Sequence, residues 1–132
     1  MKWWVKGNVP SSKNSRQWTG KYFVVSKTVT KYRKATRAEY ERMAPQFKFE
    51  AAKYELPLTV TFTFVRGTKH KFDYINPCQT VQDDMVKYGW IEDDNCEFII
   101  PIFEPYKYDK EYPGVWIEIK PELNKLKDER ET

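Results

Sequence analysis

The sequence predicts a single α/β (α+β) domain in which one mixed β-sheet packs against helices. Its length of 132 residues is common for one domain, and a hydrophobic fraction of 40% is enough for one core. Segments with strand-like alternation are separated by segments that favour helix, in the order β-β-α-β-α-β-β. We therefore assign the domain to residues 1–120 and a charged C-terminal tail to residues 121–132.

Two strands and one long helix are predicted in the first half of the chain. Residues 1–6 alternate loosely between polar and apolar side chains and predict the first strand. Residues 7–16 form a basic, turn-rich loop, and residues 22–26 are a β-branched and aromatic run that predicts the second strand. Residues 31–54 favour helix, which Pro45 is expected to interrupt or divide.

A second helix is predicted over residues 76–88. Asn76 is a good N-cap residue and Pro77 suits the first helical position. Gln79 follows three residues after Asn76, as in a capping box. Gly89 is expected to end the helix.

Three further strands complete the predicted sheet. Residues 58–66 alternate between large apolar side chains and threonines, which is the clearest strand pattern in the chain. Residues 98–103 predict another strand, in which Pro101 favours an edge or a bulge. Residues 115–119 predict the last strand, and the tail beyond residue 120 is expected to fray or to form a loose helix.

The charge distribution fits a nucleic-acid partner without requiring one. The formal net charge is +4, with a sequence pI near 8.9. Basic residues crowd the first third of the chain: Lys13, Arg16, Lys21, Lys27, Lys31, Arg33, Lys34 and Arg37. Acidic residues cluster later: Asp83, Asp84, Glu92, Asp93, Asp94 and Glu97. A metal-using nuclease and an ordinary dipolar surface both produce this division.

Other classes of protein are disfavoured. Cys78 and Cys96 lack CxxC spacing, and His70 is the only histidine, so a zinc site is not expected. Two reduced thiols are favoured over one disulfide. No apolar run approaches the roughly 18 residues of a membrane span, and Lys2 and Lys6 interrupt the apolar N-terminus, so we expect no signal peptide and a cytoplasmic protein.

The helical rotation of 100° per residue divides the side chains of the second helix between two faces. The core face is predicted to carry Cys78, Val81, Met85 and Tyr88. The polar face is predicted to carry Asn76, Gln79, Asp83 and Lys87. Asp84 lies toward the other flank and is expected to be solvated, which separates its role from that of Asp83.

Four aspartates lie near the ends of this strand–loop–helix–turn unit: Asp73, Asp83, Asp93 and Asp94. Mg²⁺ prefers hard oxygen ligands, commonly carboxylates together with substrate phosphate and water. Clustered carboxylates repel each other unless a cation lies between them, so their convergence would favour a metal site. The alternative is an ordinary polar turn at residues 93–95 and a surface helix residue at position 83.

Two basic loops could hold a DNA backbone. Their candidate DNA-binding residues are Lys13, Asn14 and Arg16 in the first loop, and Lys69 and Lys71 in the second. His70 could assist proton transfer, although a lone loop histidine is more often a bystander. Each loop taken alone could equally be a solvated surface.

Residues 71–95, KFDYINPCQTVQDDMVKYGWIEDDN, resemble the signature of RusA-type Holliday junction resolvases. That family carries D-x-D-N-x-x-K, an aspartate four residues beyond the lysine, and a D-D pair near the next strand. The residues that match without a gap are Asp73, Asn76, Asp83, Asp93 and Asp94. A polar, basic stretch after Gly7 and Pro10 is also similar.

The resemblance implies a homodimeric endonuclease that resolves four-way DNA junctions in recombination and repair, using Mg²⁺ or Mn²⁺. Proteins of this family are common in phages and prophages. Asp73 and Asp94 would hold the metal, with Asp93 and Asp83 as further ligands or orienting groups.

Two positions depart from the family pattern. Ile75 occupies the second acidic position of D-x-D-N, and Gln79 occupies the lysine position. Asn76 and Gln79 could then serve as neutral oxygen ligands. An alternative is a catalytically weak or inactive junction-binding protein of the same fold, and a third is an interaction domain with an acidic surface turn.

Overall fold

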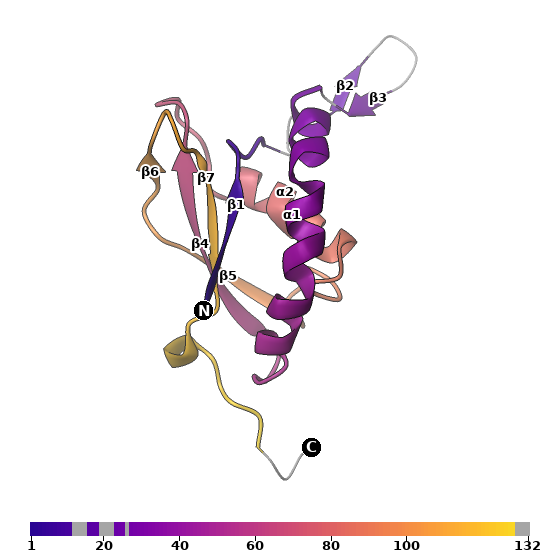
Figure 1. Cartoon of the computed structure of the whole chain (residues 1–132), viewed down its shortest axis with the longest axis vertical. Helices are drawn as coiled ribbons and strands as arrows, with labels where there is room; N and C mark the ends of the chain where they lie inside the picture. The colour runs from indigo at the N-terminus through magenta and orange to yellow at the C-terminus, as the bar shows by residue number, and fades with distance from the viewer. Residues whose placement is uncertain (12–15, 19–22, 26, 129–132) are drawn as a thin grey trace.

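The computed structural model describes residues 1–11, 16–18, 23–25 and 27–128, with backbone alone at 16–18 and 23–25. This part of the chain forms a mixed α+β domain in which a five-stranded sheet carries two α-helices (Figure 1). The sheet strands are β1 (Lys2–Lys6), β4 (Leu58–Arg66), β5 (Ile99–Phe103), β6 (Lys107–Tyr108) and β7 (Gly114–Glu118). The remaining elements are β2 (Arg16–Trp18), β3 (Phe23–Val25), α1 (Lys27–Ala51), α2 (Ile75–Lys87) and a 3₁₀ turn at Pro121–Leu123.

Strand β4 lies at the centre of the sheet. The strand order is β1-β7-β4-β5, and β6 pairs with β4 beyond the end of β5. β7 pairs antiparallel with both β1 and β4, whereas β5 and β6 run parallel to β4. The predicted mixed sheet is therefore confirmed, and Pro101 lies on an edge strand as predicted. The strand predicted at residues 22–26 was wrongly placed in this sheet, because β3 pairs antiparallel with β2 in a separate two-stranded sheet.

The core lies between the sheet and the two helices. The alternating residues Leu58, Val60, Phe62 and Phe64 of β4 are each at most 2% exposed. The helix residues that pack in the same cluster include Tyr40 and Phe47 of α1 and Val81 and Met85 of α2. Burial of one face of β4 against both helices thus fixes where α2 lies on the sheet.

Helix α1 passes through Pro45 without a break, so the prediction of an interruption was wrong. A proline inside a helix removes one backbone hydrogen bond. Around it, Met43, Ala44 and Phe47 are all buried in the core. Packing of this face holds the helix together across the proline.

The prediction for the C-terminal end of α2 was right, and the prediction for its N-terminal end was wrong. Gly89, with φ 79°, follows the helix, and the Trp90 amide donates to the Met85 carbonyl at 2.8 Å. This left-handed glycine reverses the chain, as predicted. At the other end the N-cap is Tyr74 with no side-chain capping bond, so the predicted Asn76 cap was wrong.

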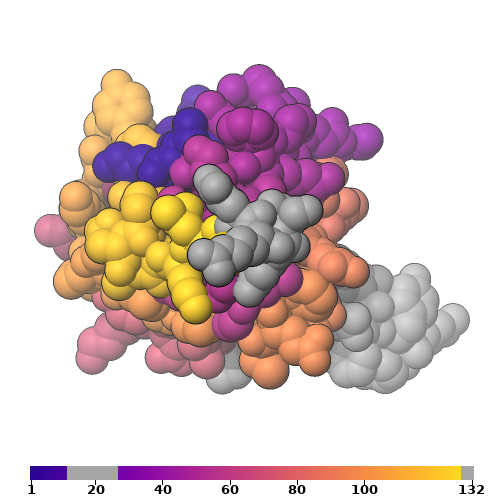
Figure 2. All heavy atoms as spheres, turned by 90° about the horizontal axis from the view of Figure 1, so that it is seen from below, coloured from indigo at the N-terminus to yellow at the C-terminus, as the bar shows by residue number. Residues whose placement is uncertain are grey.

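The first part of the predicted C-terminal tail is held against the rest of the domain rather than frayed. The Asn124 side chain accepts from the Thr59 amide at 2.8 Å and donates to the Thr59 carbonyl at 3.0 Å. Leu126 forms a bridge with Tyr54. Seen from below, this yellow segment lies on the underside of the molecule (Figure 2).

Neither described helix has the length and apolar character that crossing a lipid bilayer requires. Both cysteines are free, Cys78 buried and Cys96 exposed. Burial raises the pKa of the Cys78 thiol to about 12, so this thiol stays protonated and packs as a core residue.

A candidate acidic site along helix α2

The outer side of α2 joins two of the predicted aspartates through one amide. Gln79 Nε2 donates to Asp83 Oδ1 at 2.7 Å and to Asp94 Oδ2 at 3.0 Å. Gln79 and Asp83 lie one helical turn apart, which confirms the predicted shared face. Asp94 reaches them because Gly89 turns the chain back along the helix. Two carboxylate oxygens therefore converge on a single nitrogen.

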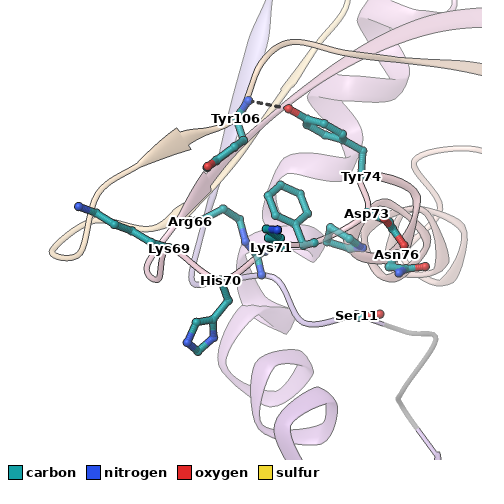
Figure 3. A pocket seen from close by; sticks show the side chains of 11 residues that line it. Ser11, Arg66, Lys69, His70, Lys71, Asp73, Tyr74, Asn76 and Tyr106 are labelled. Atoms are coloured by element: carbon teal, nitrogen blue, oxygen red, sulfur yellow. Dashed lines mark hydrogen bonds between the residues drawn. The ribbon is translucent and has the colours of Figure 1, made fainter.

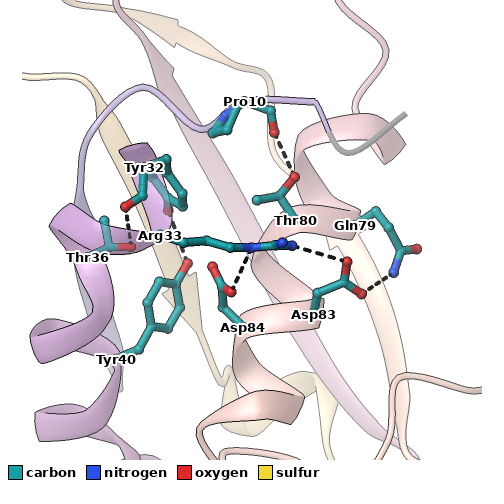
Figure 4. A network of polar contacts seen from close by, with 9 residues as sticks. All are labelled: Pro10, Tyr32, Arg33, Thr36, Tyr40, Gln79, Thr80, Asp83 and Asp84. Carbon is teal, nitrogen blue, oxygen red and sulfur yellow. Dashed lines mark hydrogen bonds and ion pairs between the residues drawn. The ribbon is translucent and has the colours of Figure 1, made fainter. Parts of the chain in front are cut away.

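The inner side of α2 carries a buried ion pair. Asp84 is 1% exposed, and its Oδ1 lies 3.3 Å from Nε of Arg33 on α1 (Figure 4). The prediction of a solvated Asp84 was wrong. Arg33 Nη2 also lies 3.6 Å from Asp83 Oδ2, so one guanidinium contacts both neighbouring aspartates.

Burial outweighs the attraction of Arg33 at Asp84. Desolvation raises the pKa of this carboxyl to about 6, although the nearby guanidinium lowers it. Asp84 Oδ2 and Arg33 Nε have no hydrogen-bond partner among the described residues. The contact is thus an ion pair of imperfect geometry, which does not fully offset the cost of burial.

Neutral polar groups surround this ion pair. The hydroxyls of Tyr32 and Tyr40 share a buried hydrogen bond of 3.1 Å, and Thr36 Oγ1 donates to the Tyr32 carbonyl at 2.9 Å. Thr80 Oγ1 donates to the Pro10 carbonyl at 2.7 Å. Burial raises the pKa of both tyrosines. These contacts join α1, α2 and the N-terminal loop around the Arg33–Asp84 ion pair.

Asp93 shapes the turn that presents Asp94. Its Oδ1 accepts from the Asp94 amide at 2.8 Å, and its Oδ2 accepts from Asn95 Nδ2 at 3.0 Å. Asn95 Oδ1 in turn accepts from the Glu97 amide at 2.8 Å. Both oxygens of Asp93 are therefore engaged within the turn.

Asp73 lies in a basic and aromatic hollow at the start of α2. This hollow has a volume of about 700 Å³ (Figure 3). Its lining residues are Ser11, Arg66, Lys69, His70, Lys71, Phe72, Asp73, Tyr74, Asn76, Pro77 and Tyr106. The predicted residues Lys69, His70 and Lys71 are thus brought beside Asp73. Of the other predicted DNA contacts, Lys13 and Asn14 lie outside the described residues, as does the side chain of Arg16.

Aromatic rings fix the wall of this first hollow. The Arg66 guanidinium lies 4.7 Å from the centre of the Phe72 ring, and Arg66 Nη1 donates to the Val9 carbonyl at 2.6 Å. The Tyr106 amide donates to the Tyr74 hydroxyl at 3.1 Å. Burial lowers the pKa of Arg66, which nevertheless stays charged at neutral pH.

Within residues 1–11 and 27–128, no group of three or more His, Cys, Asp or Glu side chains could hold a metal ion. The donor set nevertheless fits Mg²⁺, which is commonly bound through one or two carboxylates and keeps several waters. The oxygens of Asp83 and Asp94 provide two such carboxylates. Gln79 adds a neutral oxygen if its amide turns.

Arg33 and Asp84 were missed as parts of the site. Each lies beside a buried stripe of its own helix: Arg33 follows Tyr32, and Asp84 precedes Met85. Charged residues are almost never fully buried unless they are paired. That signal could have identified the two positions, although not their contact.

No family model matches this chain, and no curated protein matches its sequence. The resemblance to RusA-type resolvases therefore depends on the residues of segment 71–95 themselves.

Proposed function

We propose that this protein is a divalent-cation-dependent endonuclease of the RusA type, which resolves four-way DNA junctions in recombination and repair. The observation that supports this function best is the convergence of Asp83 and Asp94 oxygens on one amide. The basic hollow that contains Asp73 opens at the start of the same helix. The proposal includes a cytoplasmic homodimer that cuts two strands symmetrically.

Asp94 and Asp83 would hold Mg²⁺ or Mn²⁺ together with the substrate phosphate, whereas Asp73, predicted as a ligand, lines the first hollow and belongs to no group of three metal-binding side chains among the described residues. The ion would supply an activated water and neutralise charge that develops on the leaving oxygen. Asp93 keeps the turn in place, since its oxygens bind the backbone and side chain of the next two residues. The Gln79 amide nitrogen holds the two carboxylates together, and a cation bound between them would replace it.

The basic residues of the first hollow would hold the DNA backbone beside these carboxylates. Lys69 and Lys71 are exposed cations, and Arg66 is fixed between Phe72 and the Val9 carbonyl. Phosphate contacts of this kind position a strand without reading its sequence, and they make binding salt-dependent.

A cleavage assay on a four-way junction with Mg²⁺ tests this function. Asp94→Asn and Asp83→Asn are expected to reduce the cleavage rate at least a hundredfold, or roughly 3 kcal/mol in activation free energy. Glu92→Gln is the matched control, because Glu92 is an exposed acid of the same turn that contacts neither Gln79 nor the aspartates. Full activity in Asp94→Asn would defeat the assignment.

A second candidate is a junction-binding protein that cuts weakly. Ile75, at the second acidic position of the family pattern, begins α2 and is 69% exposed, so the helix start carries an apolar side chain in place of a carboxylate. This candidate predicts salt-sensitive binding of junctions with little cleavage. Ile75→Asp should then tighten Mn²⁺ binding, and an unchanged affinity would count against a degenerate site.

A further inference from the structure

A second hollow lies between α1 and α2, at the far end of α2 from Asp73. It has a volume of about 310 Å³. Its lining residues are Arg33, Lys34, Arg37, Lys87 and Tyr88. Four of these five side chains carry a positive charge, which is the lining that an anion requires.

Two of the four cations have no carboxylate partner. Arg33 is held by the two aspartates of α2, and Arg37 pairs with Glu41 at 2.8 Å on the exposed surface of α1. Lys34 and Lys87 form no ion pair within residues 27–128, and both are exposed. Lys87 Nζ lies over the Tyr88 ring, 5.5 Å from its centre, and its charge lowers the pKa of the Asp84 carboxyl without forming an ion pair with it. Their ammonium groups are therefore available to an outside anion.

Three of the last four carbonyls of α2 are engaged by local hydrogen bonds and so oppose such an anion less strongly. The carbonyls of Asp84, Met85 and Val86 accept hydrogen bonds from the amides of residues 88–90. Because these groups are satisfied locally, the negative end of the helix dipole is weakened where Lys87 lies.

The spacing of the two hollows along α2 is compatible with a DNA strand. Asn76 lines the first hollow and Lys87 lines the second, and 11 residues separate them. At 1.5 Å per residue this separation is roughly 16 Å, about the rise of five nucleotides of one strand in duplex DNA. Gln79 and Asp83 lie between the two ends on the same helix.

We propose that the hollow formed by Arg33, Lys34, Arg37, Lys87 and Tyr88 binds a backbone phosphate of the DNA strand whose other phosphates enter the first hollow. The DNA strand then runs along the polar side of α2 and passes Asp83 and Asp94 near the middle of the helix. This inference depends on the proposed function for its ligand, but it assigns residues outside the acidic site. Lys34 and Lys87 contact DNA, and neither takes part in cation binding.

Junction binding by Lys34→Ala/Lys87→Ala, measured without divalent ions over a range of NaCl concentrations, tests the inference. Loss of the one phosphate that both lysines contact should lower the slope of log affinity against log salt by about one, and weaken binding roughly tenfold near 0.1 M salt. Lys34→Arg/Lys87→Arg should restore the slope. Lys2→Ala/Lys53→Ala is the charge-matched control, because Lys2 lies on β1 and Lys53 beyond the opposite end of α1.

An unchanged slope in Lys34→Ala/Lys87→Ala overturns the inference. Stabilisation of the wild type by inorganic phosphate, lost in the double variant while junction binding is unaffected, also overturns it, since the hollow would then bind free phosphate only. These results leave the proposed function standing as long as Asp94→Asn abolishes cleavage. Absence of junction binding and cleavage in the wild type itself would defeat the proposed function instead.

Discussion

The two sides of helix α2 use carboxylates in opposite ways. On the inner side, Asp84 is buried and faces the guanidinium of Arg33. On the outer side, Asp83 and Asp94 share the neutral amide of Gln79, and the Asp83 side chain is 43% exposed. A buried carboxylate lowers stability at neutral pH and makes stability depend on pH. The outer carboxylates share a neutral donor and only a 3.6 Å contact to Arg33, so they remain available to a cation.

Arg33 connects the two sides. Its Nε faces Asp84 and its Nη2 faces Asp83, at 3.3 Å and 3.6 Å. The buried contact thereby limits where the guanidinium can lie, and the guanidinium limits the orientation of Asp83. We therefore expect substitutions on the inner side to change mainly the free energy of unfolding, and substitutions on the outer side to change mainly the affinity for a cation.

The largest expected effect is a pH dependence of the free energy of unfolding, which arises from the buried Asp84 on the inner side of α2. Burial raises the pKa of Asp84 from 3.8 to about 6, so the folded protein binds a proton that the unfolded chain has released between these values. The contribution of Asp84 to stability is therefore fully present below about pH 3.8 and is lost as the pH rises from 3.8 through about 6. The loss in free energy of unfolding is up to about 3 kcal/mol. Urea unfolding at several pH values measures it.

Asp84→Asn separates this contribution from those of other groups. The variant keeps the shape of the side chain and removes its titration, so its unfolding free energy should fall less than that of the wild type over the same pH interval. Asp83→Asn removes a neighbouring charge that raises the pKa of Asp84, so it should reduce the pH-dependent loss without abolishing it. Parallel curves for the wild type and Asp84→Asn would contradict the assignment of the buried carboxyl.

Local signals predicted much of the fold. The alternation of apolar residues and threonines gave the bounds of β4 without error, because a period of two has no other explanation over nine residues. Gly89 marked the reversal after α2, because only a left-handed residue allows it there. The break expected at Pro45 did not occur, because tertiary packing of α1 outweighs one lost hydrogen bond.

The site was only partly predictable for a similar reason. The helical period alone places Gln79 beside Asp83. The same Gln79 was expected to cap the helix, but its amide binds Asp94, a contact across 15 residues that no local pattern contains. The pairing of Asp84 with Arg33 joins two helices, so it requires the tertiary structure.

Removal of the guanidinium is expected to give the next largest effect. Arg33→Met leaves Asp84 buried without an opposite charge and should lower the free energy of unfolding at neutral pH by about 2 kcal/mol, a cost that protonation of Asp84 limits. Arg37→Met, one turn further along α1, removes an exposed pair with Glu41 and should leave the free energy of unfolding almost unchanged. Equal losses in the two variants would show that the buried contact contributes no more than a surface one.

A smaller effect on the free energy of unfolding is expected from the hydrogen-bonded hydroxyls of Tyr32 and Tyr40. Tyr40→Phe leaves the buried Tyr32 hydroxyl without its 3.1 Å partner and should cost about 1 kcal/mol in the free energy of unfolding. Tyr88→Phe is the matched control, because Tyr88 stacks on Tyr40 with a ring separation of 6.1 Å and is only partly buried. Thermal or urea unfolding of both variants measures the difference, and a larger loss in Tyr88→Phe would contradict it.

The smallest effect on stability is expected on the outer side, where the effect on cation binding is large. Gln79→Met should change the free energy of unfolding by less than about 0.5 kcal/mol, because the side chain is exposed. It should weaken Mn²⁺ binding roughly tenfold, because the amide that holds Asp83 and Asp94 together and can offer its oxygen to the cation is lost. Gln79→Glu should tighten Mn²⁺ binding by adding a third carboxylate. Calorimetric titration with Mn²⁺ in the absence of DNA measures the affinity of both variants. A shift of the two affinities in the same direction would show that residue 79 takes no part in a cation site with Asp83 and Asp94.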